Sequence, residues 1–216
     1  MNQVIYTCEV DSTNDAIMRC ADRNRYDHIF LFASRQTAGR GQRGNKWESE
    51  AGKNITFSLY FRPEGMKADE QFAISMGVAV AMVKILRPYV GRAKVKWPND
   101  IYVGDKKIAG ILIENRLKGG MRFRSNAPNP VSIRQITGAE VDIDRLQRRI
   151  MRMLVRMISN RHYILTPWLK REYMSCLYRR VGYHRYADGD GEFEARMMDV
   201  EPSGRVVLKD RQRRIR

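Results

Sequence analysis

The chain has 216 residues, of which 43% are hydrophobic and 30% are charged; this composition excludes a disordered chain and fits one sizeable domain, with or without a small appendage. Its formal net charge of +16 is typical of proteins with acidic partners, either protein or nucleic acid, although a solvated basic surface has the same charge. No apolar run reaches membrane-spanning length, and no signal-peptide pattern opens the chain. The three cysteines are widely spaced and match no zinc pattern, which favours a reducing, cytoplasmic compartment; they are Cys8, Cys20 and Cys176.

Strands and helices alternate along the first 180 residues. Apolar residues in continuous or alternating runs predict strands, and apolar residues three and four apart predict helices. The mixture, with a hairpin at residues 101–114 in the middle, indicates an α+β fold in which helices flank a mixed sheet. We expect strands at residues 4–10, 29–33, 55–61, 93–97, 101–103 and 106–114, and helices from about 16, from 69 to about 86 before Pro88, in a short segment ending at Gly138, at 142–160 and at 165–180.

The character of the sequence changes after Arg180. Three glycines within ten residues interrupt the helical pattern, and two short strands are expected at 192–200 and 204–209, joined by a turn. We therefore predict a main domain at residues 1–180 and a small β domain at residues 181–216.

A glycine- and arginine-rich loop follows the predicted strand at residues 29–33. Its glycines allow backbone amides to face an anion, and its arginines supply forked, charge-assisted hydrogen bonds to a carboxylate or phosphate. This composition suits a loop that closes over a small anionic ligand, whereas a solvated surface loop is the simpler alternative. The candidate ligand-binding residues of the loop are Gln36, Gly39, Arg40, Gly41, Arg43, Gly44 and Trp47.

The spacing of Gly39, Gly41 and Gly44 also satisfies the dinucleotide-binding pattern G-x-G-x-x-G. That site needs a helix directly after the glycines, and residues 45–54 have no apolar stripe at helical spacing. The next predicted strand is followed by Arg62 rather than by an acidic residue. The context therefore argues against a nicotinamide or flavin site.

Ser12, Thr13 and Asn14 stand where a helix is predicted to begin. All three are common helix N-caps, and this role alone would explain them. They would also present hydroxyl and amide groups at the positive end of a helix, where a polar ring or an oxyanion binds.

The central hairpin carries a second group of polar residues. Asn99 and Asp100 lie in a predicted turn, and they are suited to orienting a magnesium–nucleotide. Gly110 lies inside a strand, where glycine allows a close approach to the backbone. Lysines at a hairpin turn are usually solvated, but Lys107 beside a carboxylate that attacks a phosphate would stabilise the developing charge.

Taken in order, these segments resemble the biotin protein ligases, also called holocarboxylase synthetases. Ser-Thr-Asn at 12–14, the loop at 36–47, Lys-Trp-Pro-Asn-Asp at 96–100 and Lys-x-Ala-Gly-Ile-Leu-x-Glu at 107–114 occur in the family's order. The loop and the Trp-Pro-Asn-Asp segment are the most specific. The resemblance implies an α+β, class II synthetase-like catalytic domain followed by a small SH3-like β-barrel, in the form without a DNA-binding domain.

The resemblance also implies a two-step reaction. The biotin carboxylate attacks the α-phosphate of ATP to give biotinyl-5′-AMP and pyrophosphate, and a lysine amine of a biotin carboxyl carrier protein then displaces AMP. ATP and Mg²⁺ are therefore expected as co-substrate and ion, biotin as substrate, and no tightly bound metal. The acceptor would belong to acetyl-CoA carboxylase or a related carboxylase.

By the same resemblance, Arg40 and Lys107 are the catalytic residues, because they would offset the charges of carboxylate and phosphate. Biotin binding falls to Ser12, Thr13, Asn14, Gln36, Gly39, Arg40, Gly41, Lys107 and Gly110. Nucleotide binding falls to Arg43, Gly44, Trp47, Asn99 and Asp100, with Asp100 as the candidate magnesium ligand.

The chain departs from the family after Gly119. Family members continue into a strand with a Gly-Ile-Gly-Leu-Asn-like stretch, which residues 120–128 lack, and the sequence stops about where a last strand of the β-barrel would begin. Losing a central strand would leave unpaired backbone at a cost of several kcal/mol, against a total stability of about 5–15 kcal/mol. We therefore expect the natural protein to carry that strand, and an intact mass of 25.2 kDa would contradict this expectation.

Three other interpretations stay open. A ligase for lipoate or octanoate would share the fold, a basic nucleic-acid-binding protein would explain the charge but not the motifs, and a defective ligase would keep the pocket without the chemistry. Specific DNA binding is not expected, because no helix-turn-helix precedes Val4. Membrane binding is not expected, because no apolar run is long enough to span a bilayer. A homodimer is an open alternative, since family members differ in whether they dimerise.

Overall fold

The computed structural model describes residues 2–22, 26–40, 47, 50–62, 70–114, 130–189 and 191–216. Its architecture is α+β, as predicted. The chain divides into two compact units, the first with residues 1–65, 112–127 and 141–155 and the second with residues 66–111, 128–140 and 156–216. The division into domains 1–180 and 181–216 stays a proposal.

The first unit contains a three-stranded sheet in the order β1-β2-β3. β1 is parallel to β2, and β3 is antiparallel to β2. Helix α1 connects the two parallel strands, as a parallel pair requires. The elements are β1 (Asn2–Val10), α1 (Thr13–Ala21), β2 (His28–Gln36) and β3 (Thr56–Phe61).

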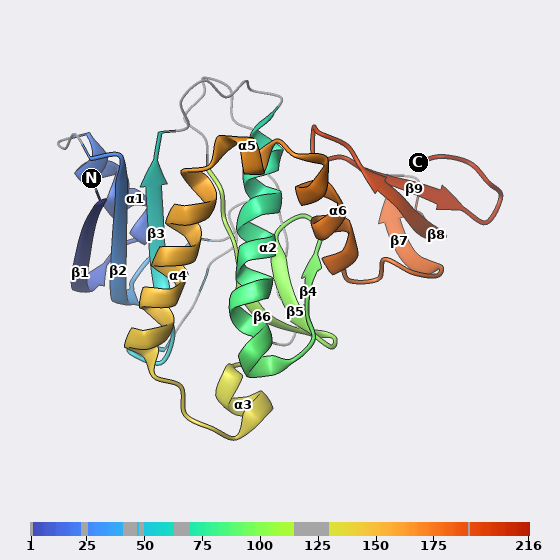
Figure 1. The fold of residues 1–216 in the computed structure, drawn as a ribbon. Helices are drawn as coiled ribbons and strands as arrows, with labels where there is room; N and C mark the ends of the chain where they lie inside the picture. The colour runs from blue at the N-terminus through green and yellow to red at the C-terminus, as the bar shows by residue number, and fades with distance from the viewer. Residues whose placement is uncertain are drawn as a thin grey trace. The chain divides into compact units, whose positions relative to one another are not determined.

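Both faces of this sheet are covered. On one face, Ile17 of α1 packs into a cluster with Ile29 and Leu31. On the other, the rings of Phe32 and Phe57 stack with their centroids 5.3 Å apart. Figure 1 shows α1 behind the sheet and α4 in front of it. The period of two in β2 therefore separates an aliphatic layer from an aromatic layer.

Helix α4 (Ile143–Ile158) confirms the amphipathic helix predicted at 142–160. It begins after Asp142, whose carboxylate accepts a hydrogen bond from the Arg145 amide at 2.9 Å, as expected for an N-cap. Within the first unit, Leu146, Ile150 and Leu154 are buried along one side of it.

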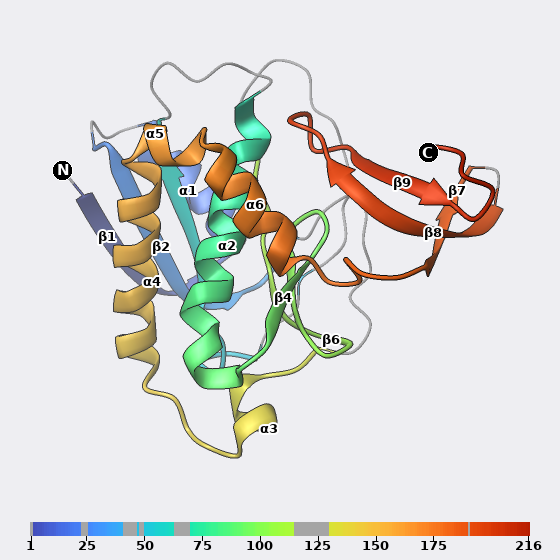
Figure 2. The same ribbon diagram turned by 45° about the vertical axis from the view of Figure 1, so that its right-hand side comes forward.

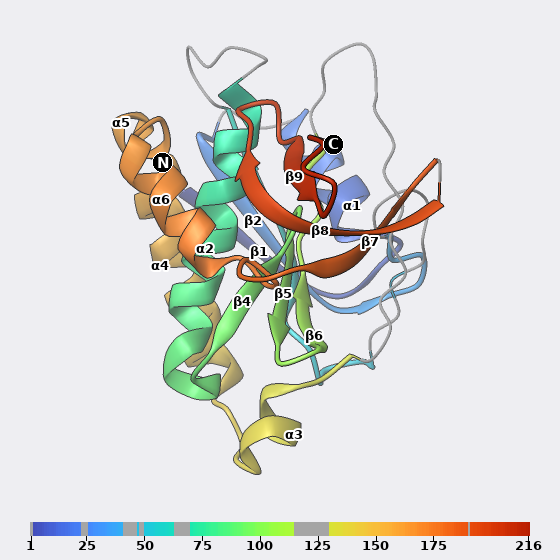
Figure 3. The ribbon, with the colours of Figure 1, turned by 90° about the vertical axis from the view of Figure 1, so that its right-hand side faces the viewer.

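The second unit contains an antiparallel sheet in the order β4-β5-β6. Helix α2 contacts β4 and β5, and Figure 3 shows the three strands beside it. Figure 2 shows α6 crossing α2, with which it is in contact. The elements are α2 (Gln71–Val90), β4 (Ala93–Lys96), β5 (Asp100–Val103), β6 (Lys106–Gly110), α3 (Ile133–Thr137), α5 (Arg161–Ile164) and α6 (Pro167–Cys176).

Helix α2 differs from its prediction at its C-terminal end. It was expected to stop before Pro88, but it continues to Val90 and ends at Gly91, which has φ = 70°. Proline removes one backbone donor, and in the last turn the helix loses only one hydrogen bond. By length and composition α2 also passes as a membrane-spanning candidate, against the sequence prediction, but 67% of its apolar window is buried inside the protein.

A second small sheet, in the order β7-β8-β9, follows α6. Its strands are β7 (His184–Asp188), β8 (Gly191–Val200) and β9 (Val206–Asp210), all antiparallel. The described strands form an open sheet rather than a closed barrel, and a small β-sheet in this part of the chain is as predicted.

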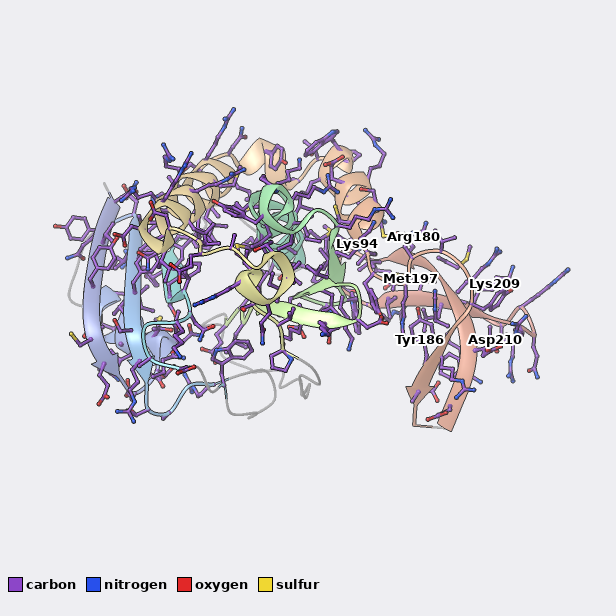
Figure 4. The ribbon with its side chains drawn as sticks, turned by 90° about the horizontal axis from the view of Figure 1, so that it is seen from below. Lys94, Arg180, Tyr186, Met197, Lys209 and Asp210 are labelled. Atoms are coloured by element: carbon purple, nitrogen blue, oxygen red, sulfur yellow. The ribbon has the colours of Figure 1, made fainter. Side chains whose placement is uncertain are left out.

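The last residues of the chain pair with this sheet. Leu208 and Arg216 exchange two backbone hydrogen bonds of 2.9 Å, and the Asp210 carboxylate accepts from the Arg214 guanidinium at 2.9 Å. Burial raises the pKa of Asp210, but its hydrogen bonds from Arg214 and Arg216 outweigh burial and lower that pKa. Arg180 donates to the Met197 carbonyl at 3.0 Å from the segment before β7 (Figure 4).

Other predicted boundaries were wrong by a few residues. β6 ends at Gly110 rather than at residue 114, and the helix expected at 165–180 is α6, which begins after Thr166 and ends at Cys176. The Thr166 hydroxyl accepts from the Leu169 amide at 3.2 Å, which fixes that start. Helix α5 and strand β7 were not predicted. The departure from the family at residues 120–128 lies outside the described residues.

Candidate functional site

The predicted site residues fall into two groups, one in each unit. In the first unit, Gln36 at the end of β2 is bound to the first turn of α1. Its side-chain oxygen accepts hydrogen bonds from the Thr13 amide at 2.8 Å and from the Thr13 hydroxyl at 2.9 Å. Because the oxygen is occupied, the amide nitrogen of Gln36 is left as a donor at the start of the loop.

Ser58 on β3 belongs to this cluster, although it is not among the site residues predicted from the sequence. Its hydroxyl lies 2.9 Å from the Thr13 hydroxyl and donates to the Asn14 side-chain carbonyl. Ser58 is buried, and a buried hydroxyl in an apolar strand needs partners. The signal in the sequence was a serine that interrupts the apolar run at residues 55–61.

Ser12 occupies the N-cap position of α1 with an extended backbone, but its hydroxyl makes no cap hydrogen bond. It is only 2% exposed. The hydroxyl group of this serine therefore does not cap the helix, and the ligand-binding role of Ser12 stays a prediction.

Arg40 is held by carboxylates from two segments. Its guanidinium lies 2.6 Å from Asp15 on α1 and 3.7 Å from Glu114. Glu114 also accepts a hydrogen bond from the Asn14 amide at 2.9 Å. These groups are about half exposed, and exposed ion pairs contribute only about 0–1 kcal/mol. An anionic ligand could therefore replace the carboxylates at little cost.

The glycine- and arginine-rich loop is closed at its base by its two described ends. The Trp47 amide donates to the Gly39 carbonyl at 2.8 Å. A Cβ atom at Gly39 would lie 2.3 Å from the Trp47 carbonyl oxygen, so only glycine fits there. The remaining predicted loop residues, Gly41, Arg43 and Gly44, lie outside the described residues.

In the second unit, Asp100 on β5 and Lys107 on β6 form a buried ion pair. The Lys107 ammonium lies 2.7 Å from the Asp100 carboxylate, and the side chains are 7% and 14% exposed. Gly110 lies directly opposite Asp100 in the antiparallel register. Lys107 is thus not a solvated hairpin lysine, but a fixed positive charge beside the strand glycine.

The turn before Asp100 is fixed by contacts along its length. The Asn99 amide donates to the Ile111 carbonyl, the Trp97 indole donates to the Gly204 carbonyl at 2.9 Å, and the Tyr173 hydroxyl donates to the Pro98 carbonyl at 2.9 Å. Burial raises the pKa of Tyr173, so its hydroxyl remains a donor at physiological pH. The turn therefore presents Asp100 from a rigid support.

These residues fit a magnesium ion only in a limited way. Within the described ranges, no three or more His, Cys, Asp or Glu side chains lie together in a way that could hold a metal ion. Asp100 offers one carboxylate, and one of its oxygens already contacts Lys107. This suits an ion carried by substrate phosphates with one protein ligand, and not an ion held by protein groups alone.

One cavity in the described residues contains no candidate residue. It has a volume of about 490 Å³ in the first unit. No polar cluster comparable with the one around Gln36 lines it, so we assign it no role. Its walls are Ile5, Thr7, Val10, Ala16, Arg19, Cys20 and Leu31.

Comparison with known proteins finds a family match over half of the chain. The model of the Biotin/lipoate A/B protein ligase family matches residues 6–123. The bifunctional ligase/repressor BirA of Escherichia coli is 38% identical over 113 residues, covering 51% of this chain and 34% of that protein. The biotin–[acetyl-CoA-carboxylase] ligase of Mycobacterium tuberculosis is 28% identical over 186 residues, covering 79% of this chain and 69% of that protein. The chain spans only about a third of the length of the BirA proteins it matches.

Solved structures support the fold. The biotin protein ligase of Aquifex aeolicus in complex with biotin and ATP superimposes with a TM-score of 0.78 at 21% identity, covering 99% of this chain and 94% of that one. The biotin protein ligase of Leishmania major in complex with biotinyl-5-AMP gives a TM-score of 0.65 at 18% identity, covering 99% and 97%. At these identities the likeness concerns the architecture alone.

Proposed function

The chain belongs to the biotin/lipoate A/B protein ligase family, and from this premise we propose that it activates biotin with ATP as biotinyl-5′-AMP and transfers the biotinyl group to a lysine of a carrier protein. The relatives from Mycobacterium tuberculosis and Paracoccus denitrificans are named as biotin–[acetyl-CoA-carboxylase] ligases. These names support biotin as the substrate and the biotin carrier of a carboxylase as the partner.

In the first step, a biotin carboxylate oxygen bonds to the α-phosphorus of ATP, and the bond from that phosphorus to the bridging oxygen breaks to release pyrophosphate. Two anionic groups must meet, so a fixed positive charge lowers the barrier. Lys107 carries the proposal, because it is a buried ammonium that a carboxylate already holds in place. Arg40 supplies a second charge from the base of the loop.

In the second step, the neutral amine of the carrier lysine attacks the acyl carbon, AMP leaves, and the amine loses a proton. No residue of the chain forms a covalent bond in this route. Thr13, Asn14 and Gln36 would orient the polar end of biotin, since their mutual hydrogen bonds fix which donors and acceptors remain available.

Magnesium would enter with the ATP phosphates, with Asp100 as its one protein ligand, and would neutralise the charge of the leaving pyrophosphate. The described cysteines are all free, which supports the proposed cytoplasmic location, where thiols stay reduced.

The test is transfer to a carrier domain that has one acceptor lysine. The protein, ATP, Mg²⁺ and biotin are incubated with the carrier, and its intact mass is measured with and without ATP. We expect ATP-dependent addition of one biotinyl group, and none on a carrier whose acceptor lysine is replaced by arginine. Addition without ATP would contradict the proposal.

Two pairs of variants locate the chemistry. Lys107→Ala is compared with Lys106→Ala, an exposed neighbour on the same hairpin, and Arg40→Ala is compared with Arg35→Ala, an exposed arginine paired with Glu9. Removing a group that stabilises transition-state charge costs roughly 10²–10³ in rate. We expect that loss for Lys107→Ala and a smaller loss for Arg40→Ala, with the controls unchanged. Equal losses in a variant and its control would overturn the assigned roles.

A further inference from the structure

Helix α4 carries five arginines that the proposed reaction does not use, and four of them belong to the first unit. Arg145, Arg148 and Arg152 are exposed, and Arg149 is half-buried. At 100° per residue they fall within an arc of about 100° on the helix surface, opposite the buried Leu146, Ile150 and Leu154. Their row is about 10 Å long, given a rise of 1.5 Å per residue. We call these four residues the α4 arginine row.

Their lack of partners sets these arginines apart within the first unit. The other described arginines of that unit each have a side-chain partner: Arg19 with Asp11, Arg35 with Glu9, Arg40 with Asp15, and Arg62 with Tyr60. Over the described part of the chain, no carboxylate lies within ion-pair distance of the α4 arginine row. Asp144 in the first turn of α4 is the acidic residue nearest the row along the helix, and it forms no ion pair with these arginines. Like charges three and four residues apart on a helix repel each other weakly, and an external anion on this surface would relieve that repulsion.

We propose that the α4 arginine row binds the phosphodiester backbone of nucleic acid without reading its sequence. Duplex DNA carries one charge per roughly 1.7 Å of axis, so about six phosphates lie along the length of the row. Arginine suits this role because its planar, always charged fork matches phosphate oxygens. The overall charge of +16 favours the same polyanion.

The surface fits other partners less well. Protein interfaces place aromatic and apolar residues at their centre, and the arginine row has none. Membrane-surface helices insert an apolar face, but the apolar face of α4 is buried. Base-specific recognition needs polar side chains on base edges, and the row offers only charge. Phosphate contacts alone are therefore the expected mode of binding.

The test is fluorescence anisotropy with two labelled 20-base-pair duplexes of unrelated sequence, titrated with the full chain at several salt concentrations. Each neutralised phosphate contributes about −0.9 to the slope of log K against log salt. We expect equal binding to both duplexes, and a slope that becomes shallower by about 3.6 when all four arginines of the row are replaced by glutamine.

The control variant replaces Arg171, Arg185, Arg196 and Arg213 by glutamine, four exposed arginines elsewhere, and changes the net charge equally. Thermal unfolding verifies that each variant folds. If the fourfold variant does not fold, the double variant Arg148→Gln/Arg152→Gln replaces it, and the salt slope should then change by about half as much. An equal loss in the control, no binding by the wild type at low salt, or a strong preference for one duplex would overturn the proposal. Unchanged DNA binding together with impaired carrier modification in the α4 variant would also overturn the proposal, since the surface would then bind an acidic protein.

Discussion

The Asp100–Lys107 ion pair gives the sharpest prediction about the second unit. Two opposite charges 2.7 Å apart attract by on the order of 6 kcal/mol at an effective dielectric constant of 20, and desolvation offsets much of this. Replacing one partner leaves the other charged and buried, which costs about 3–5 kcal/mol. Lys107→Met should therefore destabilise the protein by that amount, which is a large part of a total of about 5–15 kcal/mol.

The double variant Lys107→Met/Asp100→Asn separates the pair from the packing. It leaves no buried charge, so it should be less destabilised than the sum of its single variants by about 1–3 kcal/mol. The assay is urea unfolding followed by circular dichroism for all four proteins, with Lys106→Met as the exposed control. Additive losses in the two single variants would refute the reasoning, because they would show that the two charges do not interact.

Three further predictions test separate parts of the structure. Gly204 has φ = 89°, and a Cβ atom there would lie 2.6 Å from Phe72, so Gly204→Ala should lower the free energy of unfolding by about 1–3 kcal/mol. Gly104 has φ = 58° but open space around it, so Gly104→Ala should be less destabilising in the same urea assay. The reverse order would contradict the packing of Gly204 against Phe72. Thr13→Val keeps the shape but removes the hydroxyl group of the Gln36 cluster, so the KM for biotin should rise about tenfold with little change in kcat, and an unchanged KM would contradict the assigned role. Arg19 of α1 lowers the pKa of Asp11 from 3.8 to about 2, so the contribution of this carboxylate to stability is complete above pH 3.8 and is lost as the pH falls towards 2. The difference in thermal stability between wild type and Asp11→Asn should therefore shrink over that pH range. A constant difference would show that the ion pair does not cause it.

The sequence predicted the features that depend on local pattern. The mixed α+β class, the hairpin with its turn at Gly104, and the end of the short helix at Gly138 follow from periodicity and turn chemistry, and the structure confirms them. The ligand-binding role of the loop stays a prediction. The structure shows only that Gly39 is needed where the two described ends of the loop meet, because a Cβ atom there would lie 2.3 Å from the Trp47 carbonyl oxygen.

The features it did not predict depend on tertiary contacts. Ser58 joins the Thr13 cluster only because β3 pairs with β2 beside α1. Arg40 contacts Asp15, which is 25 residues away along the chain, and Glu114, which is 74 residues away. From the sequence, Lys107 is expected to be a solvated turn lysine, but in the fold its side chain is buried and its ammonium meets the Asp100 carboxylate. Burial and charge pairing of this kind have no periodic signal in a single sequence.

The central claim is that the chain makes biotinyl-5′-AMP, and pyrophosphate exchange tests it most directly. Labelled pyrophosphate is incubated with the protein, ATP and Mg²⁺, in the presence of biotin, lipoate, octanoate or no acid, and label is measured in ATP. We expect exchange with biotin alone. Exchange supported by lipoate or octanoate in place of biotin would move the chain to the other branch of its family, and no exchange with any acid would contradict adenylation itself.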